Sequence, residues 1–118
     1  MRSMSFMLTT DQIRSRTKTV TRRTGWANLK PGTLLRAVVK GMGLRKGERM
    51  EPLAIIQVVD VCRPILSGID PADVVREGFQ GMSREEFMEM FCESRKGCTP
   101  NTVVTCIEFK YVPGGRLE

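Results

Sequence analysis

The chain has no histidine among its 118 residues. Histidine is the commonest general base in enzymes and the usual partner of a nucleophilic serine or cysteine, so Ser-His and Cys-His pairs are excluded. Any catalysis must therefore come from lysine, acidic, threonine, cysteine or tyrosine side chains.

Long apolar runs are also missing, and none approaches the length of a membrane span. The opening residues, MRSMSFMLTT, lack the apolar segment of a secretion signal. These absences predict a cytoplasmic protein with no membrane partner. The length and a hydrophobic content of 41% predict one globular domain at 1–112, followed by a frayed tail at 113–118. We expect a monomer or a weak dimer.

The four cysteines contain no CxxC pair. Cys62 and Cys106 lie in apolar strand-like runs, which predicts buried small hydrophobic residues. Cys92 and Cys98 leave two interpretations open, a thiolate pair or half of a metal site. Zinc usually takes four ligands and this spacing is not a known zinc motif, so we expect no metal and no cofactor. The absent secretion signal argues against a secreted disulfide framework.

Positive charge is concentrated in the first part of the chain. Residues 1–50 hold 12 Lys and Arg against 2 Asp and Glu, whereas residues 51–118 hold 7 against 11. This asymmetry favours a basic surface able to hold phosphates. The alternative is that folding mixes the two halves and leaves no such surface.

Hydrophobic patterning and turn residues predict the order of elements. Strands are expected at residues 5–8, 18–23, 34–39, 52–65 and 102–112, with a short helix within 9–16. Residues 40–51 form a basic, Gly-rich stretch with GxG at Gly41 and Gly43. A lone GxG is weak, so a hairpin loop is favoured over a phosphate cradle.

Two further helices are predicted between the fourth and fifth strands. Asp70 can cap the first, with Pro71 at its first position, and Ser83 and Glu86 make a capping box for the second. Phe87, Met90 and Phe91 then share one face, which predicts core packing. The order of elements indicates an α+β fold with a small barrel or curled sheet.

Five segments occur in an order that resembles the ASCH domain, a branch of the PUA-like superfamily. They are KTVTRR after a short helix, KPGTLLRAV, EPLAIIQVVDV, REGF before a helix, and VVTCIEFKYV. The resemblance covers nearly the whole chain. It implies an α+β fold, a small PUA-like β-barrel of about five to six strands with flanking short helices.

The resemblance also implies a range of functions. ASCH domains have been proposed to bind RNA in a cleft beside the barrel, and some members resemble nucleases. One bacterial subgroup hydrolyses N4-acetylcytidine, using a Lys and a Thr within K-T-x-T-x-R and a Glu ahead of a helix. Lys18, Thr21 and Glu77 match those positions and are the candidate catalytic residues.

Chemistry at these residues has a physical requirement. Thr21 is a poor nucleophile unless a base takes its proton, and Lys18 with a lowered pKa or Glu77 can do so. Lys18 or Arg22 can offset negative charge on an attacked amide oxygen. In an ideal strand Lys18 and Thr21 point to opposite faces, so they converge only if a turn or bulge breaks the alternation.

Other roles for the same residues remain open. Lys18 can be a surface charge, Thr21 an ordinary strand residue, and Glu77 a partner of Arg76 or Arg22. Lys18 and Glu77 can also line a binding cleft without chemistry.

The candidate nucleic-acid-binding residues are Lys18, Arg22, Arg23, Trp26 and Lys30. Arg22, Arg23 and Lys30 suit phosphate contacts, whereas Trp26 can stack on a base or cover an open end of the barrel. The favoured function is binding of a nucleic acid or nucleotide, with RNA as partner, through a basic cleft. The alternatives are an amidohydrolase acting on N4-acetylcytidine-like substrates, a ribonuclease, and an interaction protein whose basic face meets a protein partner.

Overall fold

A computed structural model describes residues 1–40, 46–47 and 50–113. Gly41 and Gly43 of the predicted loop, and the tail from residue 114, lie outside the described residues. The strands are β1 (Arg2–Ser5), β2 (Val20–Arg23), β3 (Leu34–Val38), β4 (Pro52–Cys62) and β5 (Thr105–Tyr111). The helices are η1 (Met7–Thr9), α1 (Thr10–Arg14), η2 (Leu66–Gly68), α2 (Pro71–Arg76) and α3 (Arg84–Glu93).

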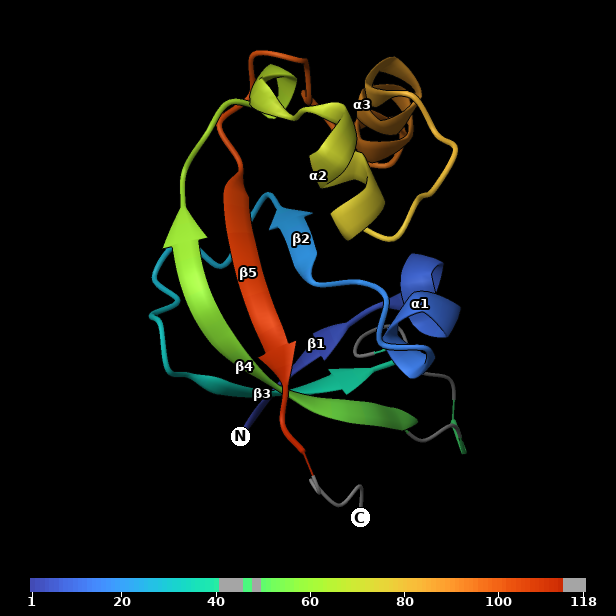
Figure 1. Cartoon of the computed structure of the whole chain (residues 1–118), viewed down its shortest axis with the longest axis vertical. Coiled ribbons are helices and arrows are strands. Elements are labelled where there is room, and N and C mark those ends of the chain that lie inside the picture. The colour runs from blue at the N-terminus through green and yellow to red at the C-terminus, as the bar shows by residue number, and fades with distance from the viewer. Residues whose placement is uncertain (41–45, 48–49, 114–118) are drawn as a thin grey trace.

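The strands form one mixed sheet in the order β1-β3-β4-β5-β2. Only the β1–β3 pair is parallel. The sheet curls into a half-barrel, and α2 and α3 lie at one end of it (Figure 1). The predicted α+β class is therefore confirmed, with five strands and short helices at the sheet's margins.

The first strand begins earlier than predicted. β1 ends at Ser5, and the apolar run at 5–8 instead leads into η1. Alternation explains the difference, because Met4 and Phe6 point into the core while Met7 and Leu8 are 60% and 68% exposed. The Phe6 amide still donates to the Val38 carbonyl at 2.8 Å, so the chain leaves the sheet just after it.

Two hydrophobic clusters hold the molecule together. The first fills the concave side of the sheet and includes Phe6, Leu35, Ile56, Ile107 and Phe109. The second lies between the helices and includes Leu66, Ile69, Val74, Phe87 and Phe91. The helical end therefore packs as a second small core beside the half-barrel.

The predicted helix starts are confirmed. The Asp70 side chain accepts a hydrogen bond from the Asp73 amide at 2.8 Å, and Pro71 is the first residue of α2. Ser83 and Glu86 form the reciprocal capping box of α3. Both caps satisfy amide groups that would otherwise lack partners at a helix N-terminus.

The prediction that Cys62 and Cys106 are buried is wrong. Cys62 is exposed and Cys106 is half-buried. In β5 the inward positions are Ile107 and Phe109, so Cys106 falls on the outer face of the sheet. Cys92 and Cys98, for which the sequence suggests a thiolate pair or half of a metal site, instead form a disulfide that ties the end of α3 to the following loop.

No helix among residues 1–40, 46–47 and 50–113 combines the length and the apolar character needed to cross a membrane.

Candidate functional site

A cavity of about 190 Å³ opens between β2, at the edge of the sheet, η1 and the layer formed by α2 and α3, called the helical layer. We call it the Lys18 cavity. Its lining residues are Ser5, Phe6, Met7, Leu8, Thr9, Lys18, Thr21, Arg22, Arg23, Glu77, Phe79, Met90, Phe91 and Arg95. The structure thus brings the three candidate catalytic residues and two further candidate binding residues into one cavity.

Trp26 and Lys30 are not among the residues that line this cavity. Trp26 packs against the first hydrophobic cluster, on the concave side of the sheet. The Arg2 guanidinium lies 4.2 Å from the centroid of the Trp26 ring. Lys30 is exposed. The two residues therefore lie apart from the other predicted site residues.

Glu77 is positioned by the end of α2. It is the C-cap residue of that helix, and Gly78 follows with φ +102°, a left-handed conformation that ends the helix. The Gln12 side chain of α1 packs on Gly78 and donates to its carbonyl at 3.0 Å. These contacts direct the Glu77 carboxylate toward β2.

Lys18 lies before β2 rather than within it. Its amide donates to the Gln12 carbonyl at 3.3 Å, and its own carbonyl accepts from the Tyr111 hydroxyl at 2.6 Å. Because Lys18 is outside the strand, strand alternation does not fix the direction of its side chain. The turn that the sequence required is supplied by the segment between α1 and β2, so Lys18 and Thr21 reach the same cavity.

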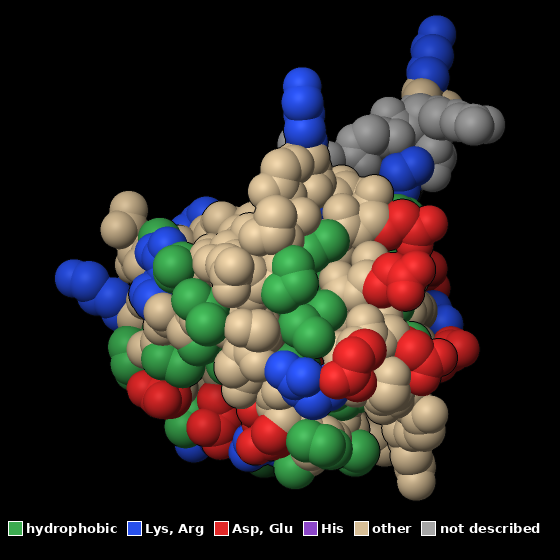
Figure 2. Space-filling view, turned by 90° about the horizontal axis from the view of Figure 1, so that it is seen from above, with side chains coloured by type: hydrophobic (Ala, Val, Ile, Leu, Met, Phe, Trp, Pro, Cys, Tyr) green, Lys and Arg blue, Asp and Glu red, His purple; other side chains and the backbone are tan. Residues whose placement is uncertain are grey.

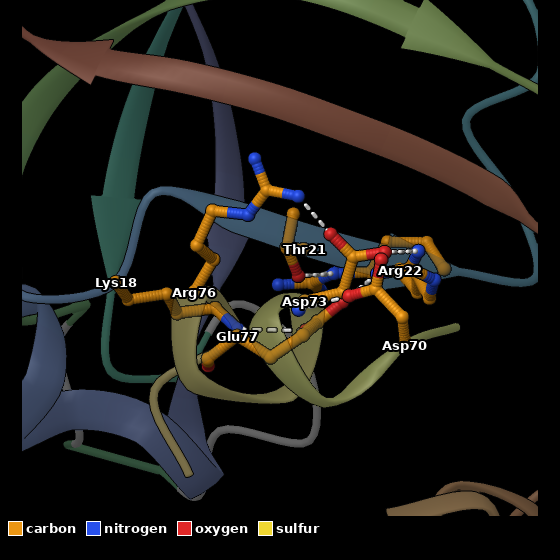
Figure 3. Close-up of polar contacts among 8 residues, drawn as sticks. Lys18, Thr21, Arg22, Asp70, Asp73, Arg76 and Glu77 are labelled. Carbon is orange, nitrogen blue, oxygen red and sulfur yellow. Dashed lines mark hydrogen bonds and ion pairs between the residues drawn. The ribbon is translucent and has the colours of Figure 1, made fainter. Parts of the chain in front are cut away.

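Lys18, Arg22 and Glu77 form a buried charge cluster (Figure 3). Lys18 Nζ lies 3.0 Å from Glu77 Oε1 and donates to the Glu77 main-chain carbonyl at 2.6 Å. Arg22 Nη1 donates to Glu77 Oε2 at 3.1 Å, and Nη2 donates to Asp73 Oδ2 at 3.2 Å. The side chains of Lys18, Arg22 and Glu77 are at most 4% exposed. Charges this buried require compensation, and here two cations meet two carboxylates.

The cluster shows the pairing of these charges. Lys18 is not a surface charge, and Glu77 pairs with Arg22. Arg76 instead forms an ion pair with Asp73. Asp73 was not identified from the sequence, although it lies four residues before Glu77, a spacing that places two helical side chains on one face.

The chemical state of Lys18 follows from its surroundings. Burial lowers the pKa of its ammonium group, and the Glu77 carboxylate opposes this by stabilising the charged form. Such an amine loses its proton more readily than an exposed lysine, which suits a general base.

The Thr21 hydroxyl is buried and accepts a hydrogen bond from Arg23 Nε at 3.1 Å. No hydrogen bond joins it to Lys18 or Glu77, although all these residues are described. A role as nucleophile therefore needs a rotation of Thr21, or of Lys18, when a ligand is bound.

Folding also mixes the charges of the two halves of the chain. Arg14, Lys18 and Arg22 from the basic half pair with carboxylates of Glu51, Glu77 and Asp73 from the acidic half. Seen from the end that carries α2 and α3, acidic and basic side chains are interspersed and no continuous basic surface is visible (Figure 2). Excess positive charge is instead found in the Lys18 cavity, where four cationic side chains face one carboxylate.

Arg95 is a lining residue that sequence reasoning missed. It follows α3 in the loop closed by the Cys92–Cys98 disulfide, and it has no local motif to mark it. Its place in the cavity wall depends on how α3 packs in the second hydrophobic cluster.

A second hollow of about 290 Å³ lies on the other side of Arg22. It is lined by Val20, Arg22, Asp60, Cys62, Pro64, Gly68, Asp73, Arg76, Cys106 and Glu108. Here three carboxylates face two guanidinium groups, the opposite balance to the Lys18 cavity. Among the described residues, no group of three or more Cys, Asp or Glu side chains is arranged to hold a metal ion.

In sequence, no family model and no curated protein matches the chain. The solved structures that match its fold include the following three. Protein EF3133 from Enterococcus faecalis V583, of family DUF984, has a TM-score of 0.65 and 18% identity, with 94% of this chain and 79% of that one covered. An ASCH domain from Lactobacillus crispatus JV V101 has a TM-score of 0.61 and 15% identity, with 93% and 78% covered.

The third structure, hypothetical protein PH0355, has a TM-score of 0.64 and 12% identity, with 94% of this chain and 96% of that one covered. At sequence identities of 12–18%, these structures show similarity in fold alone. The chain therefore has the fold of an ASCH domain, as its resemblance to that family predicts.

Proposed function

We propose that the chain is an ASCH-type domain that binds RNA or a nucleotide in the Lys18 cavity. The observation that carries this proposal is the excess of positive charge among the side chains that line the cavity. Lys18, Arg22, Arg23 and Arg95 face it, with Glu77 as the one carboxylate among its lining residues. Cationic side chains in a concave site attract and hold phosphorylated ligands.

The size and walls of the cavity suit a single base or nucleoside. Its volume of about 190 Å³ is below the roughly 300–1,000 Å³ of pockets for drug-sized ligands. Phe79, which is only partly buried, contributes aromatic surface to the wall. Unpaired bases of single-stranded RNA stack on such rings, so a loop or single strand is a better ligand than a duplex.

RNA binding is tested by fluorescence anisotropy with a labelled single-stranded RNA at several salt concentrations. We expect binding at low ionic strength that weakens steeply with salt. Arg23→Gln should weaken it, whereas Lys30→Gln removes the same charge outside the cavity and should have little effect. No binding at low ionic strength would remove RNA as the partner.

A second function, hydrolysis of an N4-acetylcytidine-like amide, is supported by a specific feature. Lys18 has a lowered pKa, bonds to Glu77 and shares a cavity with Thr21. In this reaction Lys18 or Glu77 takes the Thr21 proton, and the Thr21 oxygen attacks the acetyl carbon. The nucleobase amine leaves with a proton, and water then releases acetate.

Mass spectrometry of N4-acetylcytidine after incubation tests this second function. Wild type should produce cytidine, and Lys18→Ala and Thr21→Ala should not, while circular dichroism checks that each variant is folded. Undiminished turnover by Thr21→Ala would exclude Thr21 as nucleophile. RNA cleavage that does not depend on Thr21 would indicate a ribonuclease instead.

A further inference from the structure

The four cations of the Lys18 cavity fall into two pairs. Lys18 and Arg22 each have a carboxylate within 3.2 Å. Arg23 and Arg95 line the same cavity, but no carboxylate of the described residues lies within ion-pairing distance of either. The second pair is therefore available to an anion from outside the protein.

Arg23 is held in place by neutral groups. Its Nη2 donates to the Ser5 carbonyl at 2.7 Å and its Nε to the Thr21 hydroxyl at 3.1 Å. The guanidinium lies 4.8 Å from the centroid of the Phe6 ring. A guanidinium has about five N–H donors, so these contacts fix its orientation and leave the Nη1 group without a protein partner.

Arg95, in the loop after α3, is held in a similar way in the wall of the same cavity. Its Nη1 donates to the Phe91 carbonyl at 2.7 Å, and the guanidinium lies 3.8 Å from the centroid of the Phe91 ring. Stacking on a ring orients the flat face of a guanidinium and leaves its edge free for hydrogen bonds. Arg23 and Arg95 thus both present pre-oriented donors to the cavity.

Partial burial of these two cations is unfavourable in the free protein. Burial lowers the pKa of Arg23 to about 10 and also lowers the pKa of Arg95, while the more distant Glu77 opposes both shifts. Arg95 further lowers the pKa of Arg23, as expected for two like charges that face one space. A bound anion would relieve both the desolvation and the repulsion.

We propose that Arg23 and Arg95 form an anion site that binds the phosphate group of the ligand. The inference rests on the proposed nucleotide-binding function and narrows it, because it makes the ligand a phosphate ester rather than a neutral nucleoside. Arginine suits this role since its planar fork matches two oxygens of one phosphate. The Lys18–Glu77–Arg22 cluster then faces the base or sugar, because its cations are already paired.

Isothermal titration calorimetry with three kinds of probe tests the proposal. The probes are the four ribonucleosides, their 5′-monophosphates and inorganic phosphate. We expect at least one monophosphate to bind about tenfold or more tightly than its nucleoside, the scale of a charge-assisted hydrogen bond. Arg95→Gln should remove most of this preference.

Lys96→Gln provides a matched control. Lys96 is the next residue, is exposed and does not line the cavity, so the same loss of charge should leave the preference unchanged. A preference that persists in Arg95→Gln, or falls equally in Lys96→Gln, would overturn the anion site. The melting temperature of each variant checks that it is folded.

The outcomes separate the two proposals. Equal binding of nucleosides and monophosphates would overturn the anion site. It would support the proposal that the Lys18 cavity binds a nucleoside or nucleotide. Binding of inorganic phosphate that depends on Arg95, without binding of any nucleotide, would keep the anion site and overturn the nucleotide function. Absence of all binding would overturn both.

A short single-stranded RNA distinguishes an RNA phosphate from a free nucleotide. If RNA supplies the phosphate, it should displace the monophosphate. Arg95→Gln should then make the negative slope of log affinity against log salt shallower by about 0.7, the value for one phosphate contact on a single strand. Displacement with an unchanged slope would show that the RNA phosphate does not contact Arg95 and would overturn that assignment.

Discussion

Lys18 and Glu77 are 59 residues apart in the chain, yet the Lys18 amine contacts both the side chain and the main-chain carbonyl of Glu77. Both side chains are 3% exposed. The contact joins the segment before β2 to the end of α2. It therefore fixes the helical layer on the sheet at the point where the cavity opens.

Removing the Glu77 charge should destabilise the protein strongly. Glu77→Gln leaves Lys18 without its carboxylate and Arg22 with Asp73 alone, and loss of one partner of a buried pair costs about 3–5 kcal/mol. The free energy of unfolding in urea measures the effect. Glu89→Gln, at an exposed position of α3, should change it by less than about 0.5 kcal/mol. A similar small effect for both variants would show that Glu77 does not balance the buried cations.

Tyr111 predicts a dependence of stability on alkaline pH. Burial raises the pKa of its hydroxyl from 10.0 to about 12, so the unfolded state loses this proton first. Below pH 10 the contribution of Tyr111 is fully present, and it is lost as the pH rises toward 12. At pH 8, Tyr111→Phe should cost about 1 kcal/mol through loss of the hydrogen bond to Lys18.

Comparison of wild type with Tyr111→Phe isolates this group from the others that titrate at high pH. The difference in free energy of unfolding should shrink steadily above pH 10. A constant difference from pH 8 to 11 would mean that the hydroxyl titrates alike in the folded and unfolded states.

Gly78 should tolerate no side chain. Its φ of +102° disfavours other residues, and an added Cβ would lie 2.9 Å from Gln12 Cγ. Gly81 has a similar φ of +87° but open space around it. Gly81→Ala should therefore cost about 1–2 kcal/mol through the backbone alone, and Gly78→Ala about 1–3 kcal/mol more through overpacking.

Urea unfolding of the two glycine variants measures the difference. Adding Gln12→Ala to Gly78→Ala should recover the part of the cost that comes from Gln12 Cγ, whereas Gln12 Cβ stays 3.1 Å from the added Cβ and the hydrogen bond to the Gly78 carbonyl is lost. Equal costs at both glycines would show that the α1–α2 contact yields without strain.

Cys62 and Cys106 should form a disulfide when the protein is treated with oxidised glutathione. They are register partners on β4 and β5, and paired residues of antiparallel strands have Cα atoms about 4.5–5.5 Å apart, within the range of a disulfide. Each disulfide formed passes two electrons and two thiol protons to one molecule of oxidised glutathione, which becomes two molecules of reduced glutathione. Peptide mapping by mass spectrometry identifies the pair.

Disulfide formation also tests the shift in the register between β4 and β5. The register shifts between Val58 and Asp60, and without that shift Cys106 would face Val61. A double variant with Cys62→Ser and Val61→Cys should therefore fail to form the bond. Cross-linking of Cys106 to the introduced thiol in that double variant would contradict the register described here.

Much of the local structure follows from the sequence because it depends on neighbours in the chain. The caps at Asp70 and Ser83 and the helix start at Pro71 arise from contacts within four residues. The first strand shows the limit of such reasoning. The apolar run SFML suggested a strand, but only packing decides that Met4 and Phe6 point inward while Met7 and Leu8 do not.

The candidate site shows the same division. The lack of histidine and the presence of Lys18, Thr21 and Glu77 in family-like positions are properties of the sequence alone. That these three residues share a cavity was decided by the tertiary structure, because Lys18 lies outside β2 and α2 is anchored to α1 through Gln12 and Gly78.

The sequence by itself determined the candidate residues Lys18, Thr21 and Glu77, the α+β class and the starts of α2 and α3, since these depend on residue types and short-range spacing. The tertiary structure decided which charges are paired and which are free. Arg22 and Lys18 are neutralised by carboxylates more than 50 residues away, whereas Arg23 and Arg95 line the cavity without an ion pair to any described carboxylate. Such long-range pairings depend on strand register and helix packing, which no local pattern specifies.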